Sequence, residues 1–269
     1  MTKPAHPYDN RGSVADCDAY FDDWRARSAL AYDDPAVVRG IRYGDGEREA
    51  FDLMPGEAPN GDVLVFIHGG YWQWYSREVF AFIAPAWRAR GVHVVNLGYP
   101  LAPGASLTTM MAGVGKALTG LRTALAPYVG TVNKVVVSGW SAGGHLAMSA
   151  GAQADAVIAL SGLYDLRPLT GTSLNDVLAL TQESAEAASP ALWATSSPGP
   201  VMLGVGGSEL PALQGQSRTM HDRRVALGLP VCLASWAALH HYSVLDSFSK
   251  PGTPVFDDAY RFYTTCTSR

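Results

Sequence analysis

The sequence predicts an α/β fold with a central, mostly parallel sheet of eight strands and helices on both faces. Short apolar runs rich in β-branched residues recur along the chain, and helical stretches separate the later runs. Several of these runs are continuous rather than alternating, which is typical of strands that are covered on both faces. Two early runs followed by strand–helix alternation favour the α/β class.

The predicted strands share an apolar core and are bounded by turn-forming or charged residues. They are 37–43, 50–54, 63–67, 92–97, 134–139, 156–162, 200–206 and 230–236. In open α/β sheets the chemistry gathers at the carboxyl ends of the strands. Functional residues are therefore expected directly after these runs.

Helical spacing of apolar residues predicts the elements between the later strands. The predicted helices are 77–90, 106–127, 141–152 and 212–227. Pro85 should bend or restart the first of them. Residues 1–35 are expected to form a helical N-terminal arm on a single domain spanning 1–269. The stretch 163–199 is expected to be an excursion between two strands.

Composition excludes several classes of protein. The net charge is −4 with no basic patch, which disfavours a nucleic-acid partner. Three widely spaced cysteines without a CxxC motif argue against a disulfide framework and a structural zinc site. No apolar stretch approaches the roughly 20 residues of a membrane span, and the first ten residues hold no apolar signal-peptide core. We expect a cytoplasmic protein with no metal, cofactor or membrane partner; the oligomeric state stays open, a homodimer included.

Residues 135–150, VVVSGWSAGGHLAMSA, carry the strongest chemical signal. Gly139–Gly143 matches G-x-S-x-G, with an apolar strand before it and a helix rich in small residues after it. This is the context of a nucleophile elbow, where a sharp turn projects the serine Oγ above the sheet. Ser141 is therefore the predicted nucleophile. The helix N-terminus beneath it favours a developing negative charge.

A serine nucleophile needs a base, which follows the acid in the chain order of this kind of site. His240 and His241 come after the last predicted strand, where a base is expected. His241 is favoured because a helix starts directly behind it, at Tyr242. His145 lies within a helix and is interpreted as a packing residue, and His221 as a surface residue.

The acid should follow the strand at 200–206. Glu209 lies in that loop and is the predicted acid. Asp222 is a rival, but it falls inside the next predicted helix. Asp165 is another rival, after the preceding strand, and is interpreted as a loop-supporting residue.

The loop after the third strand predicts an oxyanion hole. His68, Gly69 and Gly70 precede Tyr71 and Trp72, at the place where such a site takes backbone donors. The expected donors are the N–H groups of Gly70, Tyr71 and Ala142. His68 itself is expected to brace the loop by hydrogen bonds.

These motifs together resemble the α/β-hydrolase superfamily, and within it the arylformamidase (kynurenine formamidase) group, near the hormone-sensitive-lipase-like esterases. The resemblance covers nearly the whole chain. The segments that carry it are 8–11, 68–72, 99–103, 139–146, 161–169, 209–217 and 241–245. The sequence departs from the common pattern at Glu209, where aspartate is usual, and at His240, where asparagine or aspartate is usual.

The resemblance implies an α/β-hydrolase fold and a serine hydrolase that cleaves an aryl formamide such as N-formylkynurenine. A carboxylesterase or thioesterase for small acyl groups would use the same residues, and a binding protein on a hydrolase scaffold is a third hypothesis. Trp72, Trp140 and Tyr242 are the predicted residues for binding an aromatic small molecule. For Tyr71 and Trp72, a role in an aromatic substrate slot and a role in loop packing are equally consistent with the sequence. Trp74 and Tyr75 are expected to hold loops in place.

Overall fold

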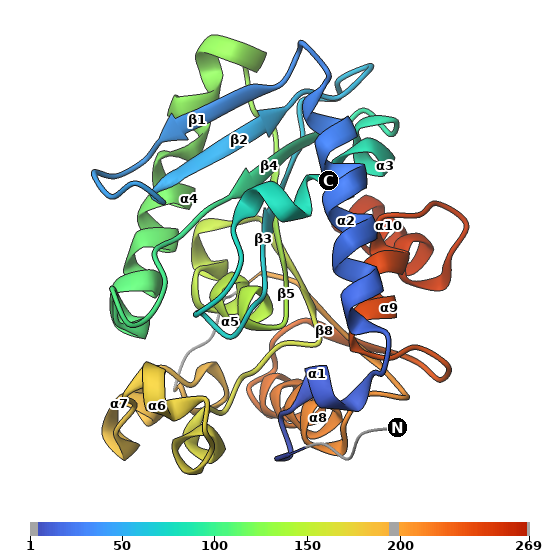
Figure 1. Ribbon diagram of the computed structural model, residues 1–269. Coiled ribbons are helices and arrows are strands. Elements are labelled where there is room, and N and C mark those ends of the chain that lie inside the picture. The colour runs from blue at the N-terminus through green and yellow to red at the C-terminus, as the bar shows by residue number, and fades with distance from the viewer. Residues whose placement is uncertain (1–4, 194–198, 268–269) are drawn as a thin grey trace.

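The structure is a computed structural model, and it describes residues 5–193 and 199–267. An eight-stranded sheet crosses its centre (Figure 1). The strands are β1 (Val38–Arg42), β2 (Ala50–Met54), β3 (Val63–Ile67), β4 (His93–Leu97), β5 (Val135–Trp140), β6 (Ala156–Leu160), β7 (Val201–Gly206) and β8 (Val231–Trp236). Each lies within or nearly within its predicted run, so the expected α/β sheet is confirmed.

The sheet has the order β1-β2-β4-β3-β5-β6-β7-β8. The pairs β1–β2 and β2–β4 are antiparallel. Every pair from β4–β3 through to β7–β8 is parallel. The carboxyl ends of β3, β5, β6, β7 and β8 therefore lie at one edge of the sheet, and the loops that follow them converge there.

The helical elements cover both faces of this sheet. They are α1 (Asn10–Ser13), α2 (Cys17–Tyr32), η1 (Arg77–Ile83), α3 (Ala84–Arg88), α4 (Leu107–Val129), α5 (Ala142–Ser149), η2 (Gly151–Gln153), η3 (Arg167–Gly171), α6 (Asn175–Leu178), α7 (Gln182–Ala187), η4 (Pro190–Leu192), α8 (Pro211–Ala226), α9 (His241–Phe248) and α10 (Pro254–Thr267). Buried side chains of α4, α5 and α8 share one hydrophobic cluster. Those of α2, α3, α9 and α10 share the other.

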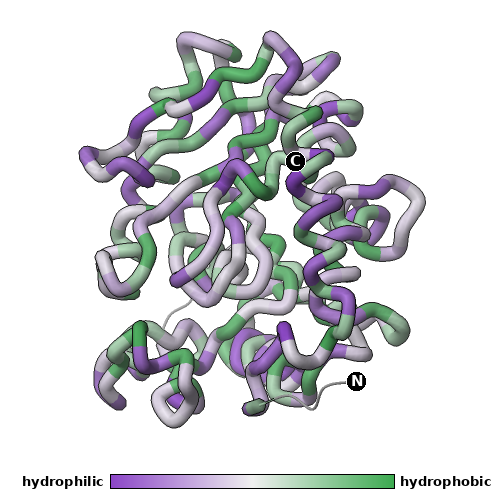
Figure 2. Tube along the Cα trace, in the orientation of Figure 1, coloured by the Kyte–Doolittle hydropathy of each residue, from purple (hydrophilic) through white to green (hydrophobic). Residues whose placement is uncertain are grey.

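Strand β3 shows how the sheet joins the two clusters. Val63, Val65 and Ile67 belong to the first cluster, whereas Leu64 and Phe66 belong to the second. All five are fully buried, as the period-2 alternation of a strand requires when both faces are covered. The hydrophobic colour concentrated along the central strands in Figure 2 follows from this burial.

Two predicted helices differ in detail. Residues 77–90 begin as the 3₁₀ helix η1 and continue as α3. Pro85 lies in the first turn of α3, where its missing N–H leaves no helical hydrogen bond unmade, so the helix restarts there. The helix predicted over 141–152 ends at Ser149 and is followed by the 3₁₀ turn η2.

The N-terminal arm packs along the second face of the sheet. Trp24 of α2 is fully buried, and its Nε1 donates to Asp246 of α9 at 3.3 Å. Ser28 Oγ donates to the Val79 carbonyl of η1 at 2.8 Å. The stretch 163–199 carries η3, α6, α7 and η4, and its residues 194–198 lie outside the described part of the chain.

Candidate active site

Ser141 lies at the turn between β5 and α5. Its φ of 59° is unusual for a residue with a side chain, and strain of this kind clusters at active sites. The turn is also tight: a Cβ on Gly139 would lie 2.1 Å from the Gly143 carbonyl oxygen, and one on Gly143 would lie 2.0 Å from that of Ile67. Only glycine fits at both positions, which explains the spacing G-x-S-x-G around the serine.

Glu209 and His241 are brought together by the ends of two neighbouring strands. Glu209 follows β7, and His241 begins α9 shortly after β8. The His241 Nδ1 atom lies 2.8 Å from Glu209 Oε2, and both side chains are almost completely buried. An ionised carboxylate only accepts hydrogen bonds, so Nδ1 carries the proton and Nε2 is left as the basic nitrogen.

The second oxygen of Glu209 is also occupied. Its Oε1 accepts from Ser161 Oγ at 2.6 Å and from the Gly206 N–H at 2.7 Å. Ser161 follows β6 and has a φ of 50°. These bonds fix the carboxylate, and sequence reasoning missed Ser161 because its partner is 48 residues away in the chain.

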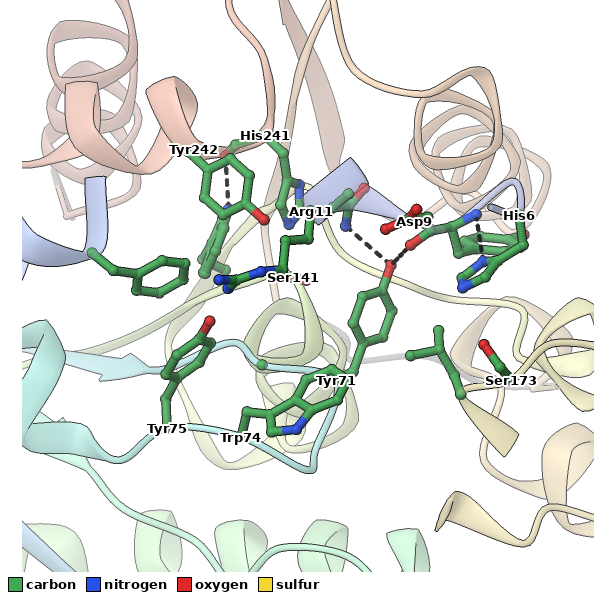
Figure 3. A pocket seen from close by; sticks show the side chains of 16 residues that line it. His6, Asp9, Arg11, Tyr71, Trp74, Tyr75, Ser141, Ser173, His241 and Tyr242 are labelled. Atoms are coloured by element: carbon green, nitrogen blue, oxygen red, sulfur yellow. Dashed lines mark hydrogen bonds between the residues drawn. The ribbon is translucent and has the colours of Figure 1, made fainter. Parts of the chain in front are cut away.

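Ser141 and His241 both line a cavity of about 550 Å³ at the carboxyl edge of the sheet (Figure 3). Trp140 and Tyr242, predicted to bind substrate, also line it. The Trp140 ring lies 4.6 Å from the His241 ring, and its Nε1 donates to the His241 carbonyl at 3.0 Å. Trp140 therefore holds the start of α9 as well as forming a wall.

The loop after β3 brings Gly70 and Tyr71 to the same cavity. Gly70 has a φ of 112°, and a Cβ there would lie 2.3 Å from the Trp74 carbonyl oxygen. Ala142 is the first residue of α5, so its N–H has no partner within the helix. The three predicted oxyanion donors therefore come from two segments beside Ser141.

His68 lies beneath this loop and is fully buried. Its ring stacks on Tyr99 at 4.4 Å and on Phe80 at 5.5 Å, and its Nδ1 lies 2.7 Å from the Gly69 carbonyl oxygen. Burial lowers the pKa of His68 to about 3, which keeps the ring neutral. Its position is that of a loop support.

The aromatic residues after Gly70 are arranged differently from expectation. Trp72 does not line the cavity; its side chain is fully buried, and its ring meets His145 edge-on at 5.1 Å. Trp74 and Tyr75, expected to hold loops in place, are lining residues instead. Tyr71, Trp72 and Tyr75 have positive φ angles, a backbone conformation that a residue pattern alone does not reveal.

The alternative histidines have other partners. His240 caps α9, with its Nδ1 accepting from the Ser243 N–H at 3.3 Å. His145 is fully buried and its Nε2 lies 2.7 Å from the Ala188 carbonyl oxygen. His221 lies partly exposed on α8 and contacts Asp222.

The alternative acids also lie apart from His241. Asp222 is largely exposed on α8. Asp165 forms an ion pair with Arg167 at 2.7 Å. The structure therefore brings Glu209, rather than Asp222 or Asp165, to His241.

Sequence reasoning missed the contribution of the N-terminal segment, residues 6–11. His6, Tyr8, Asp9, Asn10 and Arg11 all line the cavity. The segment 8–11 was noted as part of a family resemblance, but no local signal placed it beside Ser141. Its position depends on contacts with residues more than 60 positions away.

Residues 5–193 and 199–267 hold neither a candidate metal-binding cluster nor a helix that could span a membrane. No group of three or more histidine, cysteine, aspartate or glutamate side chains in this part could hold a metal ion. None of its helices is long and apolar enough to cross a membrane.

Several known proteins are similar to this chain. A family model described as BD-FAE matches residues 53–161. The chain is 26% identical to a kynurenine formamidase of Danio rerio, over 82% of this chain and 78% of that protein. It is 28% identical to a kynurenine formamidase of Salmo salar, over 78% and 76%. A crystal structure from Silicibacter sp., described provisionally as a thioesterase, superposes with a TM-score of 0.82 at 25% identity, covering 93% of this chain and 96% of that one.

Proposed function

Because the chain is an α/β-hydrolase that is similar to kynurenine formamidases, we propose that it cleaves aryl formamides such as N-formylkynurenine to the arylamine and formate. The observation that carries the proposal is the buried bond between Glu209 and His241 at the cavity that Ser141 lines. The proposal takes Ser141 as nucleophile, His241 as base and Glu209 as acid, the three roles that acyl transfer needs.

In the first half of the reaction, Ser141 Oγ attacks the formyl carbonyl while His241 Nε2 takes its proton. The oxyanion is bound by the N–H groups of Gly70, Tyr71 and Ala142. Each such donor contributes roughly 2.7–4 kcal/mol of transition-state stabilisation. Glu209 stabilises the imidazolium that forms.

In the second half, the imidazolium of His241 protonates the departing arylamine, which leaves a formyl ester on Ser141. Water then attacks that ester with His241 again acting as base, and formate leaves. An arylamine is a better leaving group than an alkylamine, so the formamide bond needs less activation than a peptide bond.

The cavity walls suit an aromatic leaving group. Trp74, Tyr75, Trp140 and Tyr242 surround the space beside Ser141 (Figure 3). Flat apolar rings bind an aryl group by stacking and burial. The formyl group is small, so the larger part of a 550 Å³ cavity is left for the amine.

A carboxylesterase or thioesterase acting on small acyl groups is the second candidate. The similarity to the Silicibacter sp. structure favours it. Esters are cleaved more easily than formamides by the same residues, so some ester turnover is expected in either case.

The test is to measure kcat/KM for N-formylkynurenine and for short p-nitrophenyl esters, with wild type and Ser141→Ala. We expect turnover of both substrates and its loss in the variant. Fast ester turnover without formamide cleavage would overturn the formamidase proposal in favour of an esterase. If neither substrate shows turnover that depends on Ser141, the chain is a binding protein on a hydrolase scaffold.

A further inference from the structure

Arg11 places a positive charge inside the candidate active site. It is the one lysine or arginine among the described residues that line the cavity. Its side chain extends between Tyr75 and Tyr242 in Figure 3, and these three residues line the cavity together with Ser141. Neither the nucleophile, the base nor the oxyanion donors need a cation at this position.

The backbone that carries Arg11 is fixed at several points. The Tyr71 hydroxyl donates to the Tyr8 carbonyl at 2.5 Å and accepts from Asn10 Nδ2 at 3.0 Å. Gln216 of α8 donates to the Tyr8 hydroxyl at 3.1 Å. The arginine therefore extends from an anchored segment rather than from a free end of the chain.

The Arg11 guanidinium has more N–H donors than its ion pair with Asp18 uses. Its ion pair with Asp18 uses Nη2, and an arginine carries five N–H donors. The side chains of Arg11 and Asp18 are 59% and 71% exposed, so their ion pair contributes little to stability. The guanidinium can therefore leave Asp18 for another anion at little cost. Asp9, which unlike Asp18 lines the cavity, accepts instead from the backbone N–H groups of Ala5 and Gly12.

The flanking phenols favour an anion as well. Burial raises the pKa of Tyr75 and of Tyr242. Both hydroxyls thus stay protonated at neutral pH and add no negative charge.

We propose that Arg11 is a specificity-determining residue that binds a carboxylate on the leaving-group side of the substrate. A planar guanidinium recognises a carboxylate through two parallel hydrogen bonds. The substrates would then be aryl formamides or aryl esters whose aromatic part carries an acid group. This inference rests on the proposed reaction at Ser141.

The test compares matched substrates with and without a carboxylate. One pair is N-formylkynurenine and its carboxamide; the other is 4-acetoxybenzoate and 4-acetoxybenzamide. The quantity measured is the ratio of kcat/KM for the carboxylate member to that for the amide member, in wild type, Arg11→Gln, Arg11→Lys and Asp18→Asn. The ester pair keeps the test valid if wild type does not cleave formamides, an outcome that overturns the proposed function alone.

For Arg11→Gln we expect this ratio to fall about 10- to 100-fold, mainly through KM of the carboxylate substrate. Arg11→Lys should recover part of the loss. Asp18→Asn should leave the ratio unchanged or raise it, because it removes a competitor for the guanidinium. The proposal is overturned if Arg11→Gln leaves the ratio unchanged, or if Asp18→Asn lowers it to the same extent, since Arg11 would then serve only as the ion-pair partner of Asp18.

Discussion

The carboxyl edge of the sheet and the N-terminal segment 6–11 line the same cavity, but they are held in different ways. Ser141, Glu209 and His241 follow strands of a sheet that is buried on both faces. The N-terminal segment is held by a few side-chain hydrogen bonds, chiefly to Tyr71 and Gln216. Catalytic groups must be held in accurate positions, and buried residues at the ends of strands meet that requirement. The N-terminal segment 6–11 lines the cavity without carrying those groups, so it can determine which substrate binds.

This comparison predicts that changes at the sheet edge affect kcat and changes in the N-terminal segment affect KM.

Replacing the acid should give the largest loss. Glu209→Gln keeps the shape of the side chain but removes the charge that holds the His241 tautomer, so kcat should fall about 10⁴-fold with little change in KM. Steady-state kinetics on N-formylkynurenine measure the change. Asp222→Asn is the matched control on α8 and should keep wild-type kcat; unchanged kcat in Glu209→Gln would mean that another group is the acid.

Lowering the pH should reduce the free energy of unfolding through buried histidines such as His145 of α5. Burial lowers the pKa of His145 to about 4, against about 6.5 in an unfolded chain. The unfolded state therefore binds the proton first as pH falls below about 6.5. Each such histidine costs about 1.4 kcal/mol of unfolding free energy per pH unit until pH reaches its folded pKa.

Urea unfolding between pH 7 and about 4.5 checks this. In His145→Gln, the fall in unfolding free energy with decreasing pH should be shallower by about 1.4 kcal/mol per pH unit. His221→Gln, at a partly exposed position on α8, is the control and should behave as wild type. Equal slopes in wild type and His145→Gln would show that His145 titrates normally.

Loosening the N-terminal segment should have the smallest effect. Tyr71→Phe removes the hydroxyl bonded to Tyr8 and Asn10 but keeps the backbone N–H proposed as an oxyanion donor. We expect KM for N-formylkynurenine to rise roughly 2- to 10-fold, with kcat within about twofold of wild type.

A double-mutant cycle sharpens the result. Asn10→Ala added to Tyr71→Phe should cost less than the sum of the two single effects, because both remove the same contact. A fall in kcat at constant KM would contradict the assignment of this segment to substrate binding.

The sequence predicted the strands because a sheet buried on both faces imposes a local pattern of apolar residues. Continuous apolar runs marked β3 and β5, and the G-x-S-x-G spacing marked the turn at Ser141 because no larger residue fits beside the serine. The loop positions of Glu209 and His241 followed from the same strand ends. Their catalytic roles stay predictions until the variants are measured.

Contacts that depend on distant parts of the chain could not be predicted in the same way. Ser161 supports Glu209 only because β6 and β7 are neighbours and its own φ is positive. Trp72 turns into the core, whereas Trp74 reaches the cavity, in a loop whose φ angles are positive at Gly70, Tyr71, Trp72 and Tyr75. Arg11 reaches the site through the path of the N-terminal arm.

The most direct test of the central claim is peptide mass spectrometry after inactivation with phenylmethylsulfonyl fluoride. The account predicts a single sulfonyl adduct, on Ser141, that accumulates in proportion to the loss of N-formylkynurenine turnover and forms slowly in His241→Ala. Full loss of turnover with Ser141 unmodified, or full modification of Ser141 with turnover intact, would contradict it.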